Sequence, residues 1–217
     1  MKKFAKAATA FKKKKKEGVE STAEGGAKGK ANKKPAKASK HTKKPQLTAQ
    51  AFQSIELCVR HLSNYGLEQG IYRAMGHPGF VEKLATQIQE GSISTADLQS
   101  EDTAPQNVAS AIKKVLQSHE PLLTYKLQPG FSELKEPEDT KLGELFSQIE
   151  KEQRALLLAL FKHLHTVAED ETTNMPKENL SQTVGVSFLG KDGSPEDIET
   201  SQKVFNVLFD AYPEPLT

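Results

Sequence analysis

Apolar residues recur at helical spacing in every long segment that follows Leu47, and this repeat restricts the fold more than any other feature of the chain. The clearest stretch is Glu152–Val167, which carries leucine, phenylalanine or valine at positions 157, 160, 161, 164 and 167. No segment alternates apolar and polar residues convincingly, as a half-buried strand would. The pattern therefore predicts an all-α fold, a single domain of about seven helices with Glu152–Val167 at its centre.

Capping and stop residues set the expected ends of these helices. Thr48 can accept a hydrogen bond at the start of the first helix, and Gly66 can end it. Asn174 is expected to cap a short helix that ends near Gly185, and Ser194 is expected to begin the last helix. The other helices are expected at Phe80–Gln89, Gln106–Gln117, Asp139–Ile149 and Glu152–Val167.

The formal net charge of +2 conceals two segments of opposite character. Residues 1–46 contain 16 lysines and three glutamates, a net charge of +13, whereas residues 47–217 contain 14 basic and 25 acidic residues, a net charge of −11. Residues 17–46 contain almost no apolar side chains, so burial cannot offset the entropy lost on ordering. We therefore predict a disordered Lys-rich basic tail over 1–46 and one helical domain over 47–217.

Residues 1–16 allow three interpretations. Four apolar side chains fall on one helical face beside lysines, a pattern compatible with peripheral binding to an anionic membrane: Phe4, Ala7, Ala8 and Phe11. The run Lys12–Lys16 would equally suit nuclear import or nucleic-acid binding, and a solvated tail without a partner is the simplest interpretation. The net negative charge of 47–217 argues against nucleic acid, because phosphate binding would need positive surface there.

The sequence offers no catalytic or metal-binding constellation of its own. It contains no GxxxxGK[ST] phosphate loop, and His163 and His165 are two residues apart, so they point to different faces of a helix. Cys58 is the only cysteine, which fits a reducing compartment, and no apolar run approaches the length of a membrane span. We expect a cytoplasmic protein without a bound metal or cofactor and without a complete active site.

A short loop bounded by glycines stands out between two of the predicted helices. It runs from Gly70 to Gly76 with the sequence GIYRAMG. Glycine allows positive φ angles and close approach of the backbone to another surface, and Ile71 can anchor the loop in the core. Arg73 would then project from a fixed base, and its planar, always charged guanidinium suits phosphate oxygens. From these residues alone, an ordinary surface arginine is the alternative.

Six stretches, in order along residues 50–212, resemble the Rho GTPase-activating (RhoGAP) domain family. The loop resembles the family's G-[IL]-[FY]-R-x-x-G motif. The other stretches are Val81–Leu84, Val108–Lys113, Glu120–Leu123, His163–Glu169 and Met175–Leu180. One match is weak evidence, but six in the family's order on a helical domain are strong evidence. The resemblance implies a GTPase activator whose partner is a Rho-family small GTPase in its GTP-bound form.

The resemblance also implies roles for particular residues. Arg73 would be an arginine finger, supplied in trans to stabilise negative charge on the transferring phosphoryl group. Lys113 would steady the finger loop, Asn179 would contact the GTPase, and Gly70 and Gly76 would shape the loop. GTP and Mg²⁺ would belong to the partner, so this chain would need no cofactor of its own.

The sequence departs from the family pattern after Lys113. The family usually carries a second basic residue four positions after the lysine, whereas this chain has Gln117 there. The segment that follows is one residue shorter, and Gly185-Val186 replaces the family's Gly-Pro. These changes leave two interpretations: an active GTPase activator, or a weak or inactive module that binds Rho-family GTPases as an adaptor.

Overall fold

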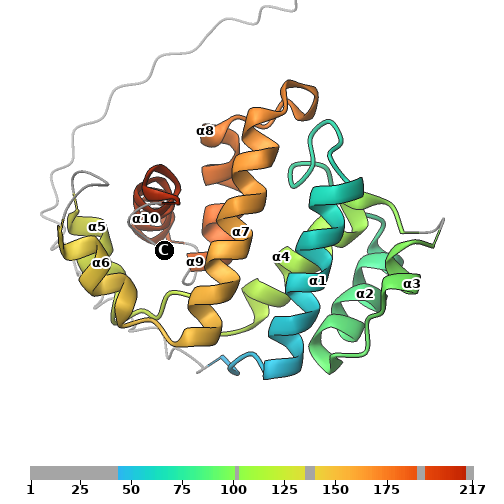
Figure 1. Cartoon of the computed structure of the whole chain (residues 1–217), viewed down its shortest axis with the longest axis horizontal. Helices are drawn as coiled ribbons and strands as arrows, with labels where there is room; N and C mark the ends of the chain where they lie inside the picture. Colours follow the sequence, from blue (N-terminus) through green and yellow to red (C-terminus); the bar gives the residue numbers. More distant parts are fainter. Residues whose placement is uncertain (1–43, 101–102, 135–139, 190–193, 214–217) are drawn as a thin grey trace, which may run out of the picture. The chain divides into compact units, whose positions relative to one another are not determined.

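The computed structural model describes residues 44–100, 103–134, 140–189 and 194–213 (Figure 1). These residues form helices joined by loops, and no strand occurs among them, so the predicted all-α fold is confirmed. The α-helices are α1 (Ala49–Tyr65), α2 (Pro78–Glu90), α3 (Thr95–Leu98), α4 (Pro105–Ser118), α5 (Gln128–Glu133), α6 (Thr140–Ser147), α7 (Lys151–Glu169), α8 (Lys177–Leu180), α9 (Val186–Leu189) and α10 (Pro195–Ala211).

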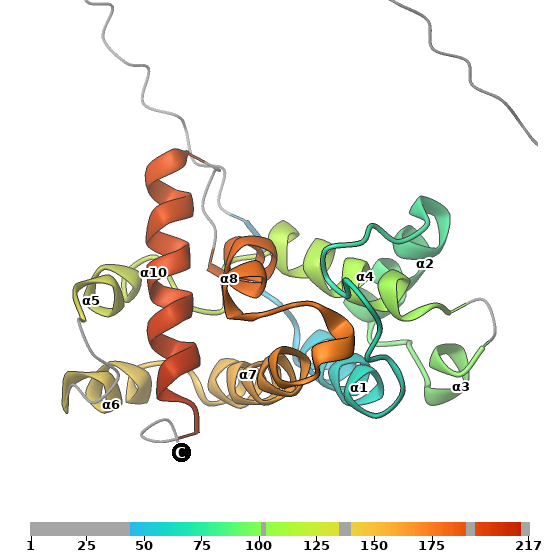
Figure 2. The ribbon, with the colours of Figure 1, turned by 90° about the horizontal axis from the view of Figure 1, so that it is seen from above.

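The long helix α7 has the central place that the apolar repeat predicts. It packs against α1 on one side and contacts α8 and α10 on the other, while α2 and α4 pack against α1 (Figures 1 and 2). The apolar positions of the repeat are all buried: Leu157, Leu160, Phe161, Leu164 and Val167. Burial of each such side chain contributes about 1.5–3 kcal/mol relative to exposure, so this stripe fixes α7 within the bundle.

The predicted caps hold the ends of the first and last helices. Thr48 Oγ1 accepts a hydrogen bond from the Ala51 amide at 3.1 Å, and the Gly66 amide donates to the Leu62 carbonyl at 2.9 Å. Ser194 Oγ accepts from the Asp197 amide at 3.1 Å at the start of α10. Side-chain acceptors therefore satisfy amide groups that the first turn of a helix leaves without a partner.

Two short helices were not expected from the sequence. Helix α3 has four residues and begins with a reciprocal pair, in which Ser94 and Asp97 bond each other's backbone amides. Helix α5 has six residues and buries Phe131, which packs within the core on the α10 side of the molecule. Neither helix spans two full turns, so neither can display a hydrophobic period.

The helix expected after Asn174 differs from its prediction at both ends. Asn174 does not cap its start: it has a φ of 50° and ends the 3₁₀ turn η1 (Glu171–Thr173) instead. The helix begins at Lys177 and continues past Gly185 through a π-helical segment, η2 (Ser181–Gly185), into α9. Gly185 serves close packing and not termination, because a Cβ there would lie 3.2 Å from Phe205 Cβ.

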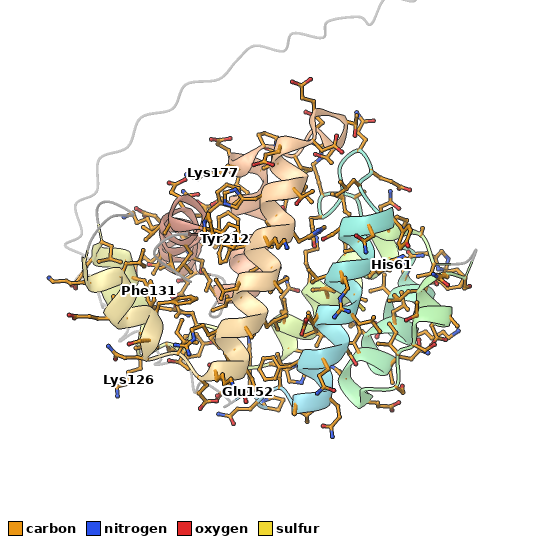
Figure 3. All side chains as sticks on the ribbon, viewed as in Figure 1. His61, Lys126, Phe131, Glu152, Lys177 and Tyr212 are labelled. Atoms are coloured by element: carbon orange, nitrogen blue, oxygen red, sulfur yellow. The ribbon has the colours of Figure 1, made fainter. Side chains whose placement is uncertain are left out.

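Packing between α8 and α10 closes this side of the domain. The Lys177 ammonium lies 2.6 Å from each carboxylate oxygen of Asp210 and over the Phe209 ring, and Figure 3 shows Lys177 projecting at this edge. His165 of α7 stacks on Phe209, with ring centroids 3.9 Å apart. The Lys177 contacts hold α8, which carries Asn179, against α10, and the His165 contact holds α10 against α7.

Most of the predicted basic tail, residues 1–43, lies outside the described residues. The three residues that follow contact the domain near the end of α4. The Pro45 carbonyl accepts from the Glu120 amide at 2.9 Å, and Lys44 Nζ donates to the Gln117 carbonyl at 2.9 Å. Of the helices described, none has the length and hydrophobicity that a membrane span requires.

Candidate functional site

The Gly70–Gly76 segment forms a compact loop between α1 and α2. The Gly70 carbonyl accepts from the amides of Arg73 and Ala74 at 2.9 and 2.8 Å. The Gly70 amide donates to the Thr173 carbonyl at 2.6 Å, which ties the loop to the turn after α7. Gly70 has a φ of 72°, a conformation that glycine adopts without steric cost.

Buried and exposed side chains divide sharply within the loop. Ile71 and Tyr72 are both fully buried, which confirms the expected anchoring by Ile71 and adds Tyr72 to it. Arg73 is exposed, and Met75 is 92% exposed two residues later. The loop therefore presents Arg73 to solvent from a base that the core holds.

Tyr72 adopts a backbone conformation that a bulky residue rarely has. Its φ is 69°, in the left-handed region, where Cβ and the backbone crowd each other. The turn at Tyr72 directs the next residue, Arg73, away from the core into which the Tyr72 ring is inserted. This angle could not be expected from the residue type, because glycine and asparagine, and not tyrosine, are typical of it.

Three side chains of α4 bind the backbone of the loop. Asn107 Oδ1 accepts from the His77 amide at 2.7 Å, and Ser110 Oγ accepts from the Gly76 amide at 3.0 Å. Lys113 Nζ donates to the Tyr72 carbonyl. These residues are three apart and so share one stripe of α4. Lys113 was expected at the loop from the sequence, but Asn107 and Ser110 were not. Their spacing places them on the same face of α4 as Lys113, but only the fold shows that this face lies against the loop.

Gly76 is required by this contact with α4. A Cβ at position 76 would lie 2.7 Å from Asn107 Oδ1, 2.7 Å from Val81 Cγ2 and 2.8 Å from Asn107 Cα, closer than carbon atoms approach in proteins. A Cβ at Gly70 would lie 3.5 Å from Arg73 Nη2, so the guanidinium of the free chain rests over Gly70. Gly76 is therefore required by close packing against α4, and Gly70 is favoured by its positive φ angle.

The surroundings of Lys113 and Arg73 differ in polarity. Lys113 is half-buried, and this burial lowers the pKa of its ammonium, whose charge is directed to the Tyr72 carbonyl. Among the residues that the structure describes, no carboxylate forms an ion pair with Arg73, whereas Lys114, one residue after Lys113, pairs with Glu82. The two cations beside the loop are thus not neutralised by described acidic side chains, in a domain whose net charge is negative.

Gln117 lies one turn beyond Lys113 on α4 and reaches α9. Its Nε2 donates to Ser187 Oγ at 2.9 Å, so the amide joins two helices. Lys44 Nζ, on the preceding segment, bonds the Gln117 carbonyl and places a positive charge at the C-terminal end of α4, where the helix dipole favours it. The sequence analysis assigned Lys44 to the tail and gave it no place at the domain.

Asn179 stands on α8 and is joined to the loop indirectly. Its Nδ2 donates to the Asn174 carbonyl at 3.5 Å, and its own carbonyl accepts from Thr183 Oγ1 at 2.8 Å. Positions 179, 183 and 187 follow at helical spacing, and Ser187 meets Gln117. Lys113 thus bonds the peptide that precedes Arg73, whereas Gln117 and Asn179 belong to a second polar stripe between α4 and the α8–α9 stretch.

The histidines on α7 have separate surroundings, as the sequence analysis expected from their spacing. His163 is buried toward the finger loop, and His165 Nε2 lies 2.8 Å from the Phe209 carbonyl. Within residues 44–100, 103–134, 140–189 and 194–213, no group of three or more His, Cys, Asp or Glu side chains is arranged to hold a metal ion. The described site consists of an exposed arginine on a fixed loop and a half-buried lysine of α4 that bonds the loop.

Comparisons with known proteins identify the family and the fold of the domain. The family model for the RhoGAP domain matches residues 53–193. The crystal structure of the BH domain from GRAF, the GTPase regulator associated with focal adhesion kinase, is 26% identical, with a TM-score of 0.61 over 76% of this chain and 94% of that one. Human Rho GTPase activating protein 15 is 18% identical and shares the fold, with a TM-score of 0.66 over 74% of this chain and 81% of that one. No curated protein matches the chain significantly.

Proposed function

Because the chain belongs to the RhoGAP domain family, we propose that it accelerates GTP hydrolysis by a Rho-family GTPase and that Arg73 is the arginine it supplies in trans. The observation that carries this proposal is the exposure of Arg73 directly after two fully buried residues, Ile71 and Tyr72. A guanidinium that must reach into another protein needs a fixed base and an unobstructed path. The Gly70–Gly76 loop provides both.

The chemistry of the transferring phosphoryl group explains what Arg73 would do. Negative charge spreads over the phosphoryl oxygens as the bond to the leaving oxygen weakens, and little else in the reaction needs a protein group. A guanidinium placed against these oxygens stabilises that charge, and such a finger accelerates hydrolysis by about 10³–10⁵-fold. GTP and Mg²⁺ are held by the GTPase, so the activator contributes the arginine and the surface that positions it.

The remaining site residues would support binding and loop geometry. Lys113 holds the Tyr72 carbonyl and so keeps the backbone before Arg73 in place. Asn179 and Gln117 would contact the GTPase from the stripe between α4 and the α8–α9 stretch. Gly70 and Gly76 allow the loop to lie against η1 and α4.

One observation favours a second function, that of an adaptor with weak activity or none. The side chain of Gln117 is neutral and its Nε2 is engaged by Ser187, so this position adds no charge toward an acidic partner. The family usually carries a positive charge at this position. If its absence here weakens the productive orientation of the partner, the domain would bind the GTP-bound GTPase without accelerating GTP hydrolysis. Measurements of GTP hydrolysis and of binding to the GTP-loaded GTPase distinguish the two functions.

The test is single-turnover hydrolysis by a panel of Rho- and Rac-type GTPases loaded with GTP. Wild type should accelerate at least one of them, and Arg73→Ala should abolish the acceleration while leaving binding to the GTP-loaded form nearly unchanged. Arg60→Ala is the matched control, since Arg60 is an exposed arginine on α1 that pairs with Glu56. Binding without acceleration by wild type would establish the adaptor, and neither binding nor acceleration would refute both functions.

We also propose a cytoplasmic location in which the basic tail brings the domain to membranes. Rho-type GTPases carry lipid groups and act at membrane surfaces, and residues 1–16 combine an apolar face with lysines. Nuclear import through Lys12–Lys16 is the competing use of the same residues. These residues lie outside the described structure, so the proposal rests on their sequence.

A further inference from the structure

We propose that His163 is a positioning residue for Arg73 and that it acts through the ring of Tyr72. The proposal rests on the proposed function of Arg73 and adds a residue that the loop motif does not contain. In this proposal, a contact between α7 and the Gly70–Gly76 loop sets the position of the Arg73 side chain.

The left-handed turn at Tyr72 must be held by its surroundings. Of the described residues other than glycine, only Tyr72 and Asn174 have positive φ, and an asparagine tolerates this conformation far better than a tyrosine. Conformations of this kind persist only where packing over-determines them, and they cluster at functional sites. Here the residue affected directly precedes the finger.

Two contacts hold Tyr72, one at each end of the residue. Lys113 Nζ bonds its carbonyl, which fixes the peptide that leads into Arg73. Its ring is fully buried and meets the His163 imidazole edge to face, with centroids 5.7 Å apart and an angle of 63° between the planes. Rotation of the Tyr72 backbone would move this ring, so the ring contact opposes any departure from the turn.

His163 is itself fixed from the opposite side. It is 1% exposed, and its Nδ1 lies 2.8 Å from Ser63 Oγ of α1. Ser63 Oγ donates its proton to the Val59 carbonyl at 3.0 Å, so we assign the Nδ1 proton to the bond with Ser63. The imidazole is therefore held between α1 and α7 in one orientation. Burial also lowers the pKa of His163 to about 4, so the ring is neutral at neutral pH.

The ring of Tyr72, and not its hydroxyl, carries the contact. Tyr72 Oη is buried, and the described residues provide no hydrogen-bond partner for it. Tyr72→Phe should therefore retain the position of Arg73, because it keeps the ring and removes only this hydroxyl. Tyr72→Leu removes the flat ring and should release the turn.

The proposal is tested with His163→Leu, which keeps an apolar side chain of similar size but removes the ring and its bond to Ser63. His165→Leu is the matched control: it lies on the same helix and loses a ring stacked on Phe209, on the α10 side. We expect His163→Leu to slow single-turnover hydrolysis at saturating activator about 10- to 100-fold, as a displaced catalytic group does, with binding to the GTP-loaded GTPase changed less than about twofold. His165→Leu should leave the saturating rate unchanged.

A double-mutant cycle separates positioning from general damage. If His163 acts through Tyr72, the Tyr72→Leu/His163→Leu double variant should lose no more rate than the larger single loss, because both substitutions break one contact. The proposal would be overturned if the rate losses of the two single variants multiplied in the double variant. It would also be overturned if His165→Leu lost as much rate as His163→Leu, or if His163→Leu lost binding in proportion to rate.

A second measurement does not depend on any GTPase. The Arg73 and Ala74 amides donate to the Gly70 carbonyl and should be protected from hydrogen exchange. His163→Leu should accelerate their exchange at least about tenfold, and Tyr72→Phe and His165→Leu should not. Normal protection in His163→Leu would refute the positioning role even if wild type proved active. Lost protection in a domain that activates no GTPase would support the contact while refuting the proposed function.

Discussion

The imidazole of His163 on α7 and the phenol ring of Tyr72 in the finger loop meet edge to face inside the core, with 5.7 Å between their centroids. The contact joins the central helix of the domain to the residue that precedes Arg73. His163 is 1% exposed, and this burial disfavours the charged form of its ring.

Stability should therefore depend on pH through His163. Burial lowers its pKa to about 4 in the folded chain, against about 6.5 in the unfolded chain. Between these values only the unfolded state binds the proton. The stability that comes from burying neutral His163 is therefore fully present above about pH 6.5 and is lost as the pH falls toward 4. The loss from this one group is of order 3 kcal/mol.

Urea unfolding at pH 7 and pH 4.5 measures this effect. Wild type and His163→Leu are compared at both values, since other groups titrate equally in the two proteins. The free energy of unfolding should fall by more in wild type than in the variant. An identical fall in both would mean that His163 is protonated with its ordinary pKa in the folded state.

Arg73→Lys should remain badly impaired in GTP hydrolysis. Lysine keeps the positive charge but lacks the planar fork that can bond two phosphoryl oxygens at once. We expect it to lose most of the about 10³–10⁵-fold acceleration attributed to a finger. Binding to the GTP-loaded form should change little, because the finger acts mainly in the transition state. Retention of the wild-type rate would show that a point charge suffices.

The longer helices could be predicted because their signals are local. Thr48, Gly66 and Ser194 lie where a helix begins or ends, and the apolar residues of α7 mark its buried face from Leu156 to Val167. The prediction that Asn174 caps a helix was wrong, because asparagine favours both the N-cap and the left-handed conformation and the local sequence does not distinguish them. The short helices α3 and α5 are fixed by tertiary packing and carry no period.

The candidate site was predictable only in part. The loop motif identified Arg73 and its glycines, and the family resemblance identified Lys113. The contacts of Asn107, Ser110 and His163 with the loop depend on which faces of α4 and α7 lie beneath it, and this follows from the fold and not from spacing. The positive φ of Tyr72 could not be foreseen, because tyrosine adopts it only when packing imposes it.

Gly76→Ala should destabilise the domain and displace the finger loop. The added methyl group would lie 2.7–2.8 Å from Asn107 and Val81, so either the loop or the start of α4 must move. We expect a cost of about 1–3 kcal/mol, as in overpacked cores, together with reduced acceleration of GTP hydrolysis. Both are measured on one preparation, by urea unfolding and by the single-turnover assay.

Gly143→Ala is the control for this substitution. Gly143 lies within α6, and a Cβ there would meet nothing within 4 Å. Alanine at that position should stabilise the domain by about 0.5–1 kcal/mol and leave the loop unchanged. If Gly76→Ala proved as stable and active as wild type, the contact between the loop and Asn107 would be looser than the structure indicates.

Gln117→Arg should increase the acceleration or the affinity for the GTP-loaded partner. An arginine can still donate to Ser187 Oγ, as the glutamine amide does at 2.9 Å, and it adds a charge one turn from Lys113. Gln148→Arg is the control for net charge, since Gln148 is exposed after α6 and its side chain donates to the Glu144 carbonyl, away from α4 and the loop. A gain confined to position 117, and reduced by added salt, is the expected result. No gain would show that the loop and groove are supported without charge at this position.

Deletion of residues 1–16 should release the protein from anionic membranes. Each lysine near such a surface contributes about 1 kcal/mol, and this segment adds an apolar face of Phe4 and Phe11. Full-length and truncated chains are sedimented with vesicles that contain phosphatidylserine and with vesicles of phosphatidylcholine alone. Only the full-length chain should sediment, only with the anionic vesicles, and less so in high salt. Equal sedimentation of both chains would place membrane binding in the domain instead. No sedimentation of the full-length chain would leave nuclear import or solvation as the use of these lysines.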